Sequence, residues 1–471
     1  RKLLEQEAVL ARFDSQEVRT MSAAERLANE RLLSARDRMR LDPKFDGGIP
    51  FRDIRQDMEG TALFRELQAL PKAATLHIHW DAVLPPRWLL EHATYHPNCF
   101  VYMDPSKSSY GTFTFFKSQP QDSYWHNISH YRSVAPNRTA YELTLLSLID
   151  VLHNEDTVNA TIDDWAKFQS FFNRVDGMVF YRPVFEEYFT EVFRQAAVDR
   201  SLTHLELRVM DLPVYDLEQG YSIEWTVSRL AALSAQATAK WPDFHGLSVI
   251  LCAMRHGSLD SVRATMHRAA AMSKTEELGD VVVGFDLVGQ EDLGYTLLHF
   301  ADVLLEARDL GLRLYLHAGE TNWMGFNTTG ANLVDAAILG ARVGHGLGLV
   351  KLPTVVDHLK ARNIAVEVCP WSNFALQFVG DMRDHPATSL LAQGVAITLS
   401  PDDPAILGYG DDWLTADWFG AVLNWDIDLA SIKQMLINSL AHSSLNTAAK
   451  AKALQSWHTR WEYWVANVTF A

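Results

Sequence analysis

Short apolar runs recur along the chain after residue 70, and each is followed by a segment whose apolar residues have helical spacing. Most of these runs are continuously apolar rather than alternating, which is typical of parallel strands buried on both faces. The eight runs lie at residues 75–79, 203–209, 247–253, 281–287, 312–318, 341–345, 364–369 and 395–400. Eight strands that alternate with helices predict a (β/α)8 barrel, the TIM-barrel fold of the α/β class.

Residues 1–66 precede the first predicted strand and have a helical pattern. The sequence from Ser22 opens with a capping box, since Glu25 follows three residues later. We predict an N-terminal helical arm over residues 1–66, appended to a barrel over residues 67–471. The alternative is a solvated helix packed on the same domain. Exposed leucines on such an arm would favour a homodimer contact.

The connection between the first and second strands is far longer than one helix and its loops, because it runs from residue 80 to residue 202. Residues from about 96 to 160 are rich in Tyr, Ser, Asn and Phe. We interpret them as an insertion in the first βα-loop, on the face of the barrel where active sites lie.

The first strand contains an unusual pair of histidines, in the sequence TLHIHWDA at residues 75–82. Successive side chains of a strand point to opposite faces, so His77, His79 and Asp81 would share one face. Two imidazoles placed in this way can chelate a metal ion. The alternative is a pair of ordinary half-buried histidines.

Chemically active side chains follow several of the other predicted strands, at the ends where barrel enzymes carry their catalytic residues. Five strand ends converge on one mouth, which makes the combination specific although each end alone is weak evidence. The residues concerned are His77 and His79, Gly289 in DLVGQED, His317 and Glu320 in LHAGET, His345 in GHG, and Asp402 and Asp403 in SPDDP.

This set contains a plausible group of ligands for one zinc ion. Zinc with an open coordination position lowers the pKa of a bound water to about 7. His345 is then free to orient that water and accept its proton, and Glu320 is free to move protons on a substrate. Asp403 can accept a hydrogen bond from the substrate. The predicted ligands are three imidazoles and one carboxylate, from His77, His79, His317 and Asp402.

Composition limits the possible partners. The formal net charge of −16 disfavours nucleic acid and anionic membranes, which both require a basic surface. No apolar run has the length of a transmembrane helix, and the charged start of the chain is unlike a signal peptide. The chain is therefore cytosolic, or secreted with its signal segment already removed. Only three cysteines occur, at 99, 252 and 369, so a disulfide framework is not expected.

Five Asn-x-Ser/Thr sequons favour secretion over a cytosolic location, because three of them crowd into the predicted insertion. An exposed, glycosylated insertion would have this pattern. The candidate glycosylation sites are Asn127, Asn137, Asn159, Asn327 and Asn467.

The motifs LHIHWDA, DLVGQED, HAGET, GHG and SPDDP, in this order, resemble the adenosine deaminase family of metal-dependent amidohydrolases. The N-terminal arm, the long insertion, PVYDLEQG and VEVCPWSN are most similar to its secreted growth-factor subfamily. The resemblance covers nearly all of residues 60–471. It implies a zinc-dependent hydrolase that converts adenosine, and 2′-deoxyadenosine, to inosine and ammonia.

The resemblance also implies roles for individual residues. His77, His79, His317 and Asp402 would bind zinc, Glu320 would donate a proton to the purine N1, and His345 would assist the attacking water. The remaining implied contacts are Asp403 with N7, the Gly289 N–H with N3, Asp81 with the ribose, and Trp165 from a segment after the insertion.

Departures from the family pattern and alternatives accompany this interpretation. The subfamily's insertion commonly carries a disulfide, whereas this one contains only Cys99. The zinc site of cytidine deaminases is excluded, because it needs two cysteines three residues apart. The alternative substrate is 5′-AMP, and the alternative class is an extracellular signalling protein that keeps the fold without turnover.

Overall fold

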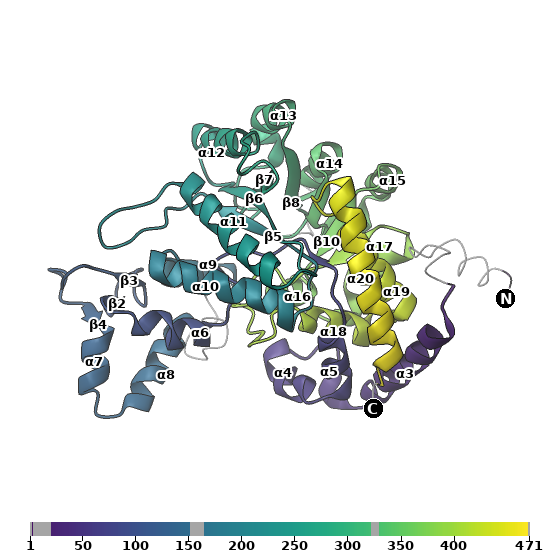
Figure 1. The fold of residues 1–471 in the computed structure, drawn as a ribbon, viewed down its shortest axis with the longest axis horizontal. Coiled ribbons are helices and arrows are strands. Elements are labelled where there is room, and N and C mark those ends of the chain that lie inside the picture. Colours follow the sequence, from purple (N-terminus) through teal and green to yellow (C-terminus); the bar gives the residue numbers. More distant parts are fainter. Residues whose placement is uncertain (1, 3–19, 151–163, 322–328, 470–471) are drawn as a thin grey trace.

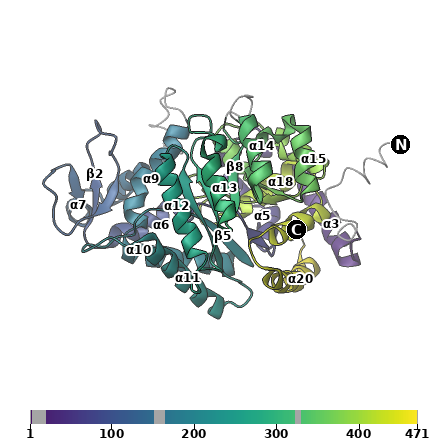
Figure 2. The same cartoon turned by 90° about the horizontal axis from the view of Figure 1, so that it is seen from above.

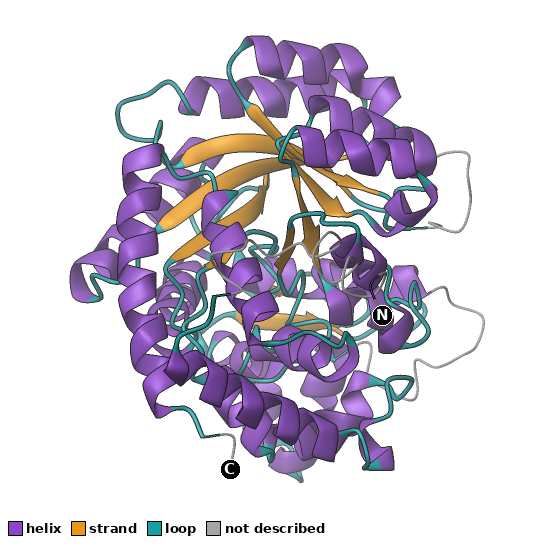
Figure 3. Cartoon of the chain, turned by 90° about the vertical axis from the view of Figure 1, so that its right-hand side faces the viewer, coloured by secondary structure: helices purple, strands orange, loops and turns teal. Residues whose placement is uncertain are grey.

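The structure, a computed structural model, describes residues 2, 20–150, 164–321 and 329–469. At its centre is a sheet of eight parallel strands surrounded by helices, which Figure 3 shows in orange and purple. Taken in chain order, each strand of this sheet pairs with the strand that follows it, so the predicted TIM-barrel fold is confirmed. The strands are β1 (Ala74–Thr75), β5 (His204–Met210), β6 (Leu247–Met254), β7 (Val282–Val288), β8 (Arg313–Ala318), β9 (Arg342–His345), β10 (Ala365–Val368) and β11 (Ile397–Leu399).

The first strand is shorter than the predicted span of 75–79. Its regular ladder ends at Thr75, because the next two backbone N–H groups donate to the Ser400 hydroxyl instead of to a neighbouring strand. Single bridges then join Ile78 to Asp402 and His79 to Arg208. The bridge to Asp402 connects the two ends of the sheet and closes the barrel.

Helices cover the outside of the barrel and connect its strands in sequence order (Figure 1). Those that lie between or after strands β5 to β11 are α11 (Ile223–Lys240), α12 (Leu259–Met272), α13 (Ala301–Asp309), α14 (Thr329–Leu339), α15 (Pro353–Ala361), α16 (Pro370–Ala375), α17 (Ala387–Ala392), α18 (Thr415–Asn424), α19 (Leu429–Ala441) and α20 (Thr447–Asn467). None of the helices in the described part of the chain combines the length and apolar character that a bilayer-spanning segment needs.

Among the described residues, the α-helices before β1 are α3 (Ala23–Met39), α4 (Phe51–Glu59) and α5 (Ala62–Gln68). The predicted capping box at Ser22 and Glu25 opens α3. Helix α3 packs against α19 and α20, and it lies beside α20 in Figures 1 and 2. Its Leu32 is fully buried. The described part of the segment predicted as an arm therefore packs on the barrel, while Leu27 stays about half exposed at 47%.

The connection between β1 and β5 contains a small antiparallel sheet in the order β3-β2-β4 and several helices. Figure 2 shows this part, with β2 and α7, at the opposite end of the molecule from α20. The described portion of the predicted insertion ends at residue 150. The elements are α6 (Pro86–Glu91), β2 (Cys99–Tyr102), β3 (Phe113–Phe115), β4 (Trp125–Asn127), α7 (Ile128–Val134), α8 (Arg138–Ile149), α9 (Asp164–Val179) and α10 (Arg182–Arg194).

Tyr215, in the motif PVYDLEQG, attaches the small sheet to helix α9. Its hydroxyl accepts a hydrogen bond from the Phe115 N–H at 3.1 Å and donates to the Gly177 carbonyl at 2.6 Å. The helix can come this close because residue 177 is a glycine, since a Cβ there would lie 2.1 Å from the Phe113 carbonyl oxygen. Strand β3 and helix α9 are thereby held in contact.

The described sequons cap or end helices. Asn127 and Asn137 are the N-caps of α7 and α8, and their side-chain oxygens accept from the backbone N–H groups three residues later. Asn467 is exposed at the end of α20. Asn159 and Asn327 lie outside the described residues. The three cysteines are free and buried, and none forms a disulfide.

Candidate active site

A cavity of about 230 Å³ lies at the carboxyl ends of the barrel strands and is walled on one side by helix α9. Met210 and Met254, the last residues of β5 and β6, form part of its wall. The other strand ends contribute the side chains that the sequence analysis selected. The predicted site residues that line the cavity are His79, Asp81, Trp165, Gly289, His317, Glu320, His345, Asp402 and Asp403.

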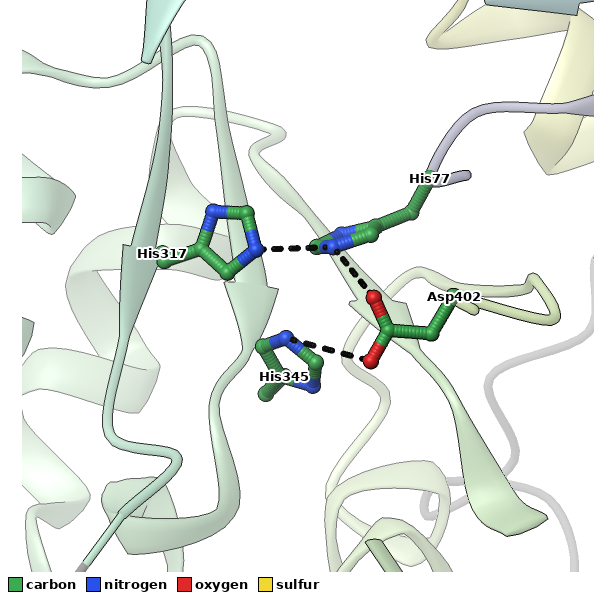
Figure 4. Close-up of side chains that lie close together, drawn as sticks. All are labelled: His77, His317, His345 and Asp402. Atoms are coloured by element: carbon green, nitrogen blue, oxygen red, sulfur yellow. Dashed lines mark hydrogen bonds and ion pairs between the residues drawn. The ribbon is translucent and has the colours of Figure 1, made fainter. Parts of the chain in front are cut away.

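His77 and His317 point toward each other (Figure 4), and their Nε2 atoms are 3.0 Å apart. Each ring is oriented by a carboxylate on its other nitrogen. His77 Nδ1 lies 2.9 Å from Glu367 Oε2, and His317 Nδ1 lies 2.7 Å from Asp286 Oδ2. Since carboxylates accept hydrogen bonds, both rings carry their proton on Nδ1.

This tautomer leaves the Nε2 lone pairs of His77 and His317 directed at each other. A proton or a metal cation between them stabilises such an arrangement, and a carboxylate that supports a metal-bound histidine in this way is common in metal sites. Asp402 Oδ1 adds a third donor atom, 3.2 Å from His77 Nε2. The donor set therefore fits a divalent cation that prefers nitrogen and oxygen ligands.

Asp402 is held in a conformation that costs energy. Its φ is +62°, in the left-handed region that non-glycine residues rarely adopt. The Ser372 hydroxyl donates to its Oδ2 at 2.7 Å, and its backbone exchanges hydrogen bonds with His77 and His79. Backbone strain of this kind is concentrated at functional sites. Burial raises the pKa of the Asp402 carboxyl, but the neighbouring imidazoles outweigh this and lower that pKa well below its usual range.

The structure groups the predicted ligands in two overlapping clusters that share Asp402. The tighter cluster contains His345 in addition to the predicted pair of histidines, and its four donor atoms lie within 4.8 Å of one another. The predicted ligand His79 belongs to the second cluster, with its Nε2 3.4 Å from Asp402 Oδ1. Members of the two clusters are His77, His317, His345 and Asp402, and His79, Asp402 and Asp403.

A chain of hydrogen bonds fixes the orientation of His345. The Ala387 N–H donates to His385 Nδ1, so the neutral His385 carries its proton on Nε2 and donates to Asn373 Oδ1 at 3.2 Å. The Asn373 amide then donates to His345 Nδ1 at 3.3 Å. In its neutral form His345 therefore carries its proton on Nε2, the atom that lies 3.6 Å from Glu320 Oε1.

Glu320 follows β8 and is almost fully buried, with 4% of its surface exposed. Its backbone N–H and that of Gly319 donate to the two carboxylate oxygens of Glu291, which fixes the turn. Burial and the charges of Asp402 and Glu291 raise the pKa of Glu320 well above its usual range. A carboxyl group in this state can hold a proton at neutral pH.

One arginine connects the two carboxylates that orient the histidines. Arg208, buried in β5, donates to Asp286 Oδ2 at 2.8 Å and to Glu367 Oε2 at 2.6 Å. Arg342 also donates to Glu367. These charges keep the pKa of Glu367 well below its usual range despite its burial. The carboxylates thus stay ionised and hold the histidine tautomers described above.

The sequence analysis missed these supporting residues, along with Asn373 and His385. A signal for the charged ones was present in the predicted buried strands. Asp286 and Glu367 interrupt the otherwise apolar runs VVVGFDL and IAVEVC, and Arg208 is one of two charged residues in THLELRV. A charge in a strand that is buried on both faces needs a partner. Nothing in the sequence marks Asn373 and His385 as neighbours of His345.

The cavity wall contains the residues expected to contact a substrate. Gly289 has φ +97°, and a Cβ there would lie 3.1 Å from Met254 Cε, so a glycine leaves its backbone accessible. Asp403 is buried, and its Oδ1 has no hydrogen-bond partner among the described residues. Burial raises the pKa of Asp81 to about 7. Trp165, from α9, lies near Phe378 with ring centroids 6.4 Å apart.

Comparisons with known proteins identify the family and the fold. The family model described as "Adenosine deaminase" matches residues 137–458. The chain is 34% identical over 428 residues to "Adenosine deaminase 2" of Dictyostelium discoideum, covering 88% of this chain and 77% of the relative. It is 33% identical over 462 residues to "Adenosine deaminase 2" of Sus scrofa, covering 94% and 89%. The structure of Arabidopsis ADAL complexed with IMP has a similar fold, with a TM-score of 0.60, 17% identity and coverage of 84% and 98%.

Proposed function

The chain belongs to the adenosine deaminase family and is a hydrolytic deaminase, and we propose that it converts adenosine, and also 2′-deoxyadenosine, to inosine and ammonia. The observation that carries the proposal is the cluster of His77, His317 and Asp402 beside the buried Glu320. Of these, His317, Asp402 and Glu320 line one cavity. Hydrolysis at the purine C6 needs an activated water and a proton donor, and this cavity offers positions for both.

The metal that we propose is zinc, held by His77, His79, His317 and Asp402. Three imidazoles and a carboxylate are typical zinc ligands, and the facing Nε2 lone pairs favour a cation at this point. A bound zinc ion lowers the pKa of water to about 7 and so supplies hydroxide at neutral pH. Glu367 and Asp286 would keep the two rings oriented for it.

Two residues then act on protons. Glu320 holds a proton at neutral pH and would donate it to N1 of the purine, which makes C6 more electrophilic. His345, with its proton on Nε2, would donate a hydrogen bond to the attacking water and hold it in place. His345 was also expected to accept a proton, and a neutral ring in this tautomer can do so at Nε2 only after its own proton has moved to Nδ1.

The remaining contacts orient the substrate. We propose that Asp403 pairs with N7, that the Gly289 N–H donates to N3, and that the ring of Trp165 forms part of the purine side of the cavity. Asp81 would accept hydrogen bonds from the ribose. All four residues line the same cavity as Glu320.

The main alternative substrate is 5′-AMP, and the charge of the cavity argues against it. None of the described residues that line the cavity is Lys or Arg, whereas five are carboxylic acids. At about 5 Å and an effective dielectric constant near 20, two unit charges repel by roughly 3 kcal/mol, about a hundredfold in affinity. The two basic residues nearest to Asp81 in the sequence point away from the cavity. Lys72 donates to backbone carbonyls, and Arg87 lies 3.5 Å from Glu91 on the surface.

We also propose that the protein is secreted and carries N-glycans. Support comes from the sequons at Asn137 and Asn467, which are exposed, and at Asn127, which is partly exposed. The side-chain oxygens of Asn127 and Asn137 cap helices, so their amide nitrogens, where a glycan attaches, are not used by the caps. A signalling protein without turnover is less favoured, because every predicted ligand and acid–base position is present.

The deciding experiment is an ultraviolet assay for the conversion of adenosine to inosine, run in parallel with AMP. We expect turnover of adenosine that a chelator abolishes and added zinc restores. The value of kcat/KM for adenosine should exceed that for AMP by at least tenfold. Failure to deaminate adenosine would refute the proposal, and equal or faster turnover of AMP would replace adenosine by the nucleotide.

A further inference from the structure

Helix α9 turns one face toward the substrate cavity. Five of its side chains line the cavity, at positions i, i+3, i+4, i+7 and i+11, which lie on a single face of a helix. Four of them are aromatic or amide side chains, whereas the last is a carboxylic acid. In order they are Trp165, Phe168, Gln169, Phe172 and Asp176.

Asp176 has no structural partner that explains it. Its Oδ1 is buried, and no described residue forms a hydrogen bond with it. Asp81 lies close enough for its charge to add to burial in raising the pKa of Asp176. Two carboxyl groups placed together in a buried site, without a cation, reduce the stability of the fold. A role in folding therefore does not account for Asp176.

The position of Asp176 within the cavity is defined by its neighbours. It lines the same cavity as Asp81, which follows β1, and Asp403, which follows β11, and the charge of Asp81 acts on it. The proposed function assigns Asp403 to the purine ring and Asp81 to the sugar. Asp176 itself comes from helix α9, after the insertion, and so reaches the cavity from outside the strand ends.

We propose that Asp176 is a specificity-determining residue that accepts a hydrogen bond from a sugar hydroxyl and, together with Asp81, excludes nucleoside 5′-phosphates. This inference rests on the proposed function. Sugar hydroxyls are donors, and a carboxylate is a strong acceptor for them. A phosphate would bring further negative charge beside two buried carboxyl groups that already repel one another, so the pair opposes it.

The test compares the parent with Asp176→Ala and Asp176→Asn, using adenosine and its 2′-, 3′- and 5′-deoxy analogues. A hydrogen bond to a charged group corresponds to a tenfold to hundredfold effect, roughly. For Asp176→Ala we expect kcat/KM for adenosine to fall at least tenfold, mainly through KM. For the analogue that lacks the hydroxyl bound by Asp176, kcat/KM should fall less than threefold, because this analogue has already lost that contact.

Asp176→Asn keeps the shape and one acceptor oxygen but removes the charge. We expect the ratio of kcat/KM for AMP to that for adenosine to rise at least tenfold in this variant. The matched control is Asp260→Asn, the same change at a side chain on α12 that is 99% exposed, which should leave that ratio unchanged. Thermal unfolding should show that Asp176→Asn melts at the parent temperature or above it.

Several outcomes would overturn the assignment. Equal losses for adenosine and all three analogues, or an unchanged AMP ratio, would show that Asp176 does not discriminate at the sugar. A variant that melts well below the parent or does not fold would show a structural role instead. An inactive parent would refute the proposed function itself. An active parent whose Asp176 variants have unchanged selectivity would refute only the role of Asp176.

Discussion

His77 Nε2 and His317 Nε2 lie 3.0 Å apart, and each ring is held in this orientation by a carboxylate on its opposite nitrogen. The two histidines come from β8 and from the segment after β1, which are not neighbours in the sheet. Because Arg208 contacts both supporting carboxylates, the orientation of the two rings depends on a single buried network.

The first prediction concerns metal binding. His317→Ala should lose zinc and activity together. Asp286→Asn removes the charge that holds His317 Nδ1, and it should weaken zinc binding by about 10- to 100-fold, the usual effect of losing such a supporting group. Competition with a chelator, followed by metal analysis, measures both. If the His317→Ala variant stayed active without bound metal, the proposed mechanism would be wrong.

The second prediction tests the proton donor. Glu320→Gln keeps the shape of the side chain and the backbone hydrogen bonds to Glu291, but it has no proton to donate. We expect kcat to fall by about 10²- to 10⁴-fold, the typical contribution of general acid catalysis, with zinc content unchanged. Glu462→Gln, at an exposed position on α20, is the matched control. A Glu320→Gln variant within tenfold of the parent would assign proton donation to another group.

The third prediction concerns N-glycans. In protein produced by a secretory host, glycosidase treatment should lower the apparent mass. Thr139→Ala destroys the sequon at Asn137 but leaves the side chain that caps α8, so it should remove the mass of one glycan without loss of stability. Asn137→Gln removes the cap as well, at a cost of about 1 kcal/mol. An unchanged mass in all cases would favour an unglycosylated protein.

The barrel could be predicted because each strand is a compact apolar run, and the ends of parallel strands necessarily meet at one mouth. Each of the eight predicted runs overlaps an observed strand, although the ladder of the first ends at Thr75. That difference follows from Ser400, whose hydroxyl accepts two backbone N–H groups in place of a neighbouring strand. A side-chain contact over more than 300 residues of separation has no local signal in the sequence.

Site residues were predictable where they belong to a strand end and not where they act from elsewhere. Asn373 and His385 reach His345 from different segments, and their roles depend on three hydrogen bonds that only the fold creates. Asp176 belongs to a run that contains several aromatic residues, where a carboxylate resembles an ordinary exposed position on an amphipathic helix. Its contact with the cavity depends on how α9 packs against strand β3.

The last prediction concerns the attachment of α3 to the barrel. Glu25 Oε1 accepts hydrogen bonds from Lys433 at 2.7 Å and Trp461 at 2.9 Å, and its Oε2 accepts from the Ser22 N–H at 2.8 Å. Burial raises the pKa of Glu25, but these contacts outweigh burial and lower that pKa to about 2. A pKa that is lower in the folded state stabilises the protein above the unfolded value of about 4.5, and this stability is lost as the pH falls toward 2.

Glu25→Gln should therefore lower the free energy of unfolding near pH 7 by up to about 3 kcal/mol, which corresponds to the shift in pKa. The amide can keep one acceptor oxygen for Lys433 and Trp461, but its NH₂ then faces the Ser22 N–H. Denaturant unfolding between pH 2.5 and pH 7 measures the effect, and the difference from the parent should shrink steadily below pH 4.5. Glu30→Gln lies on the exposed face of the same helix. Its free energy of unfolding should differ from that of the parent by less than about 0.5 kcal/mol at every pH tested. A Glu25→Gln effect that is the same at every pH would show that the charge of Glu25 does not hold α3 in place.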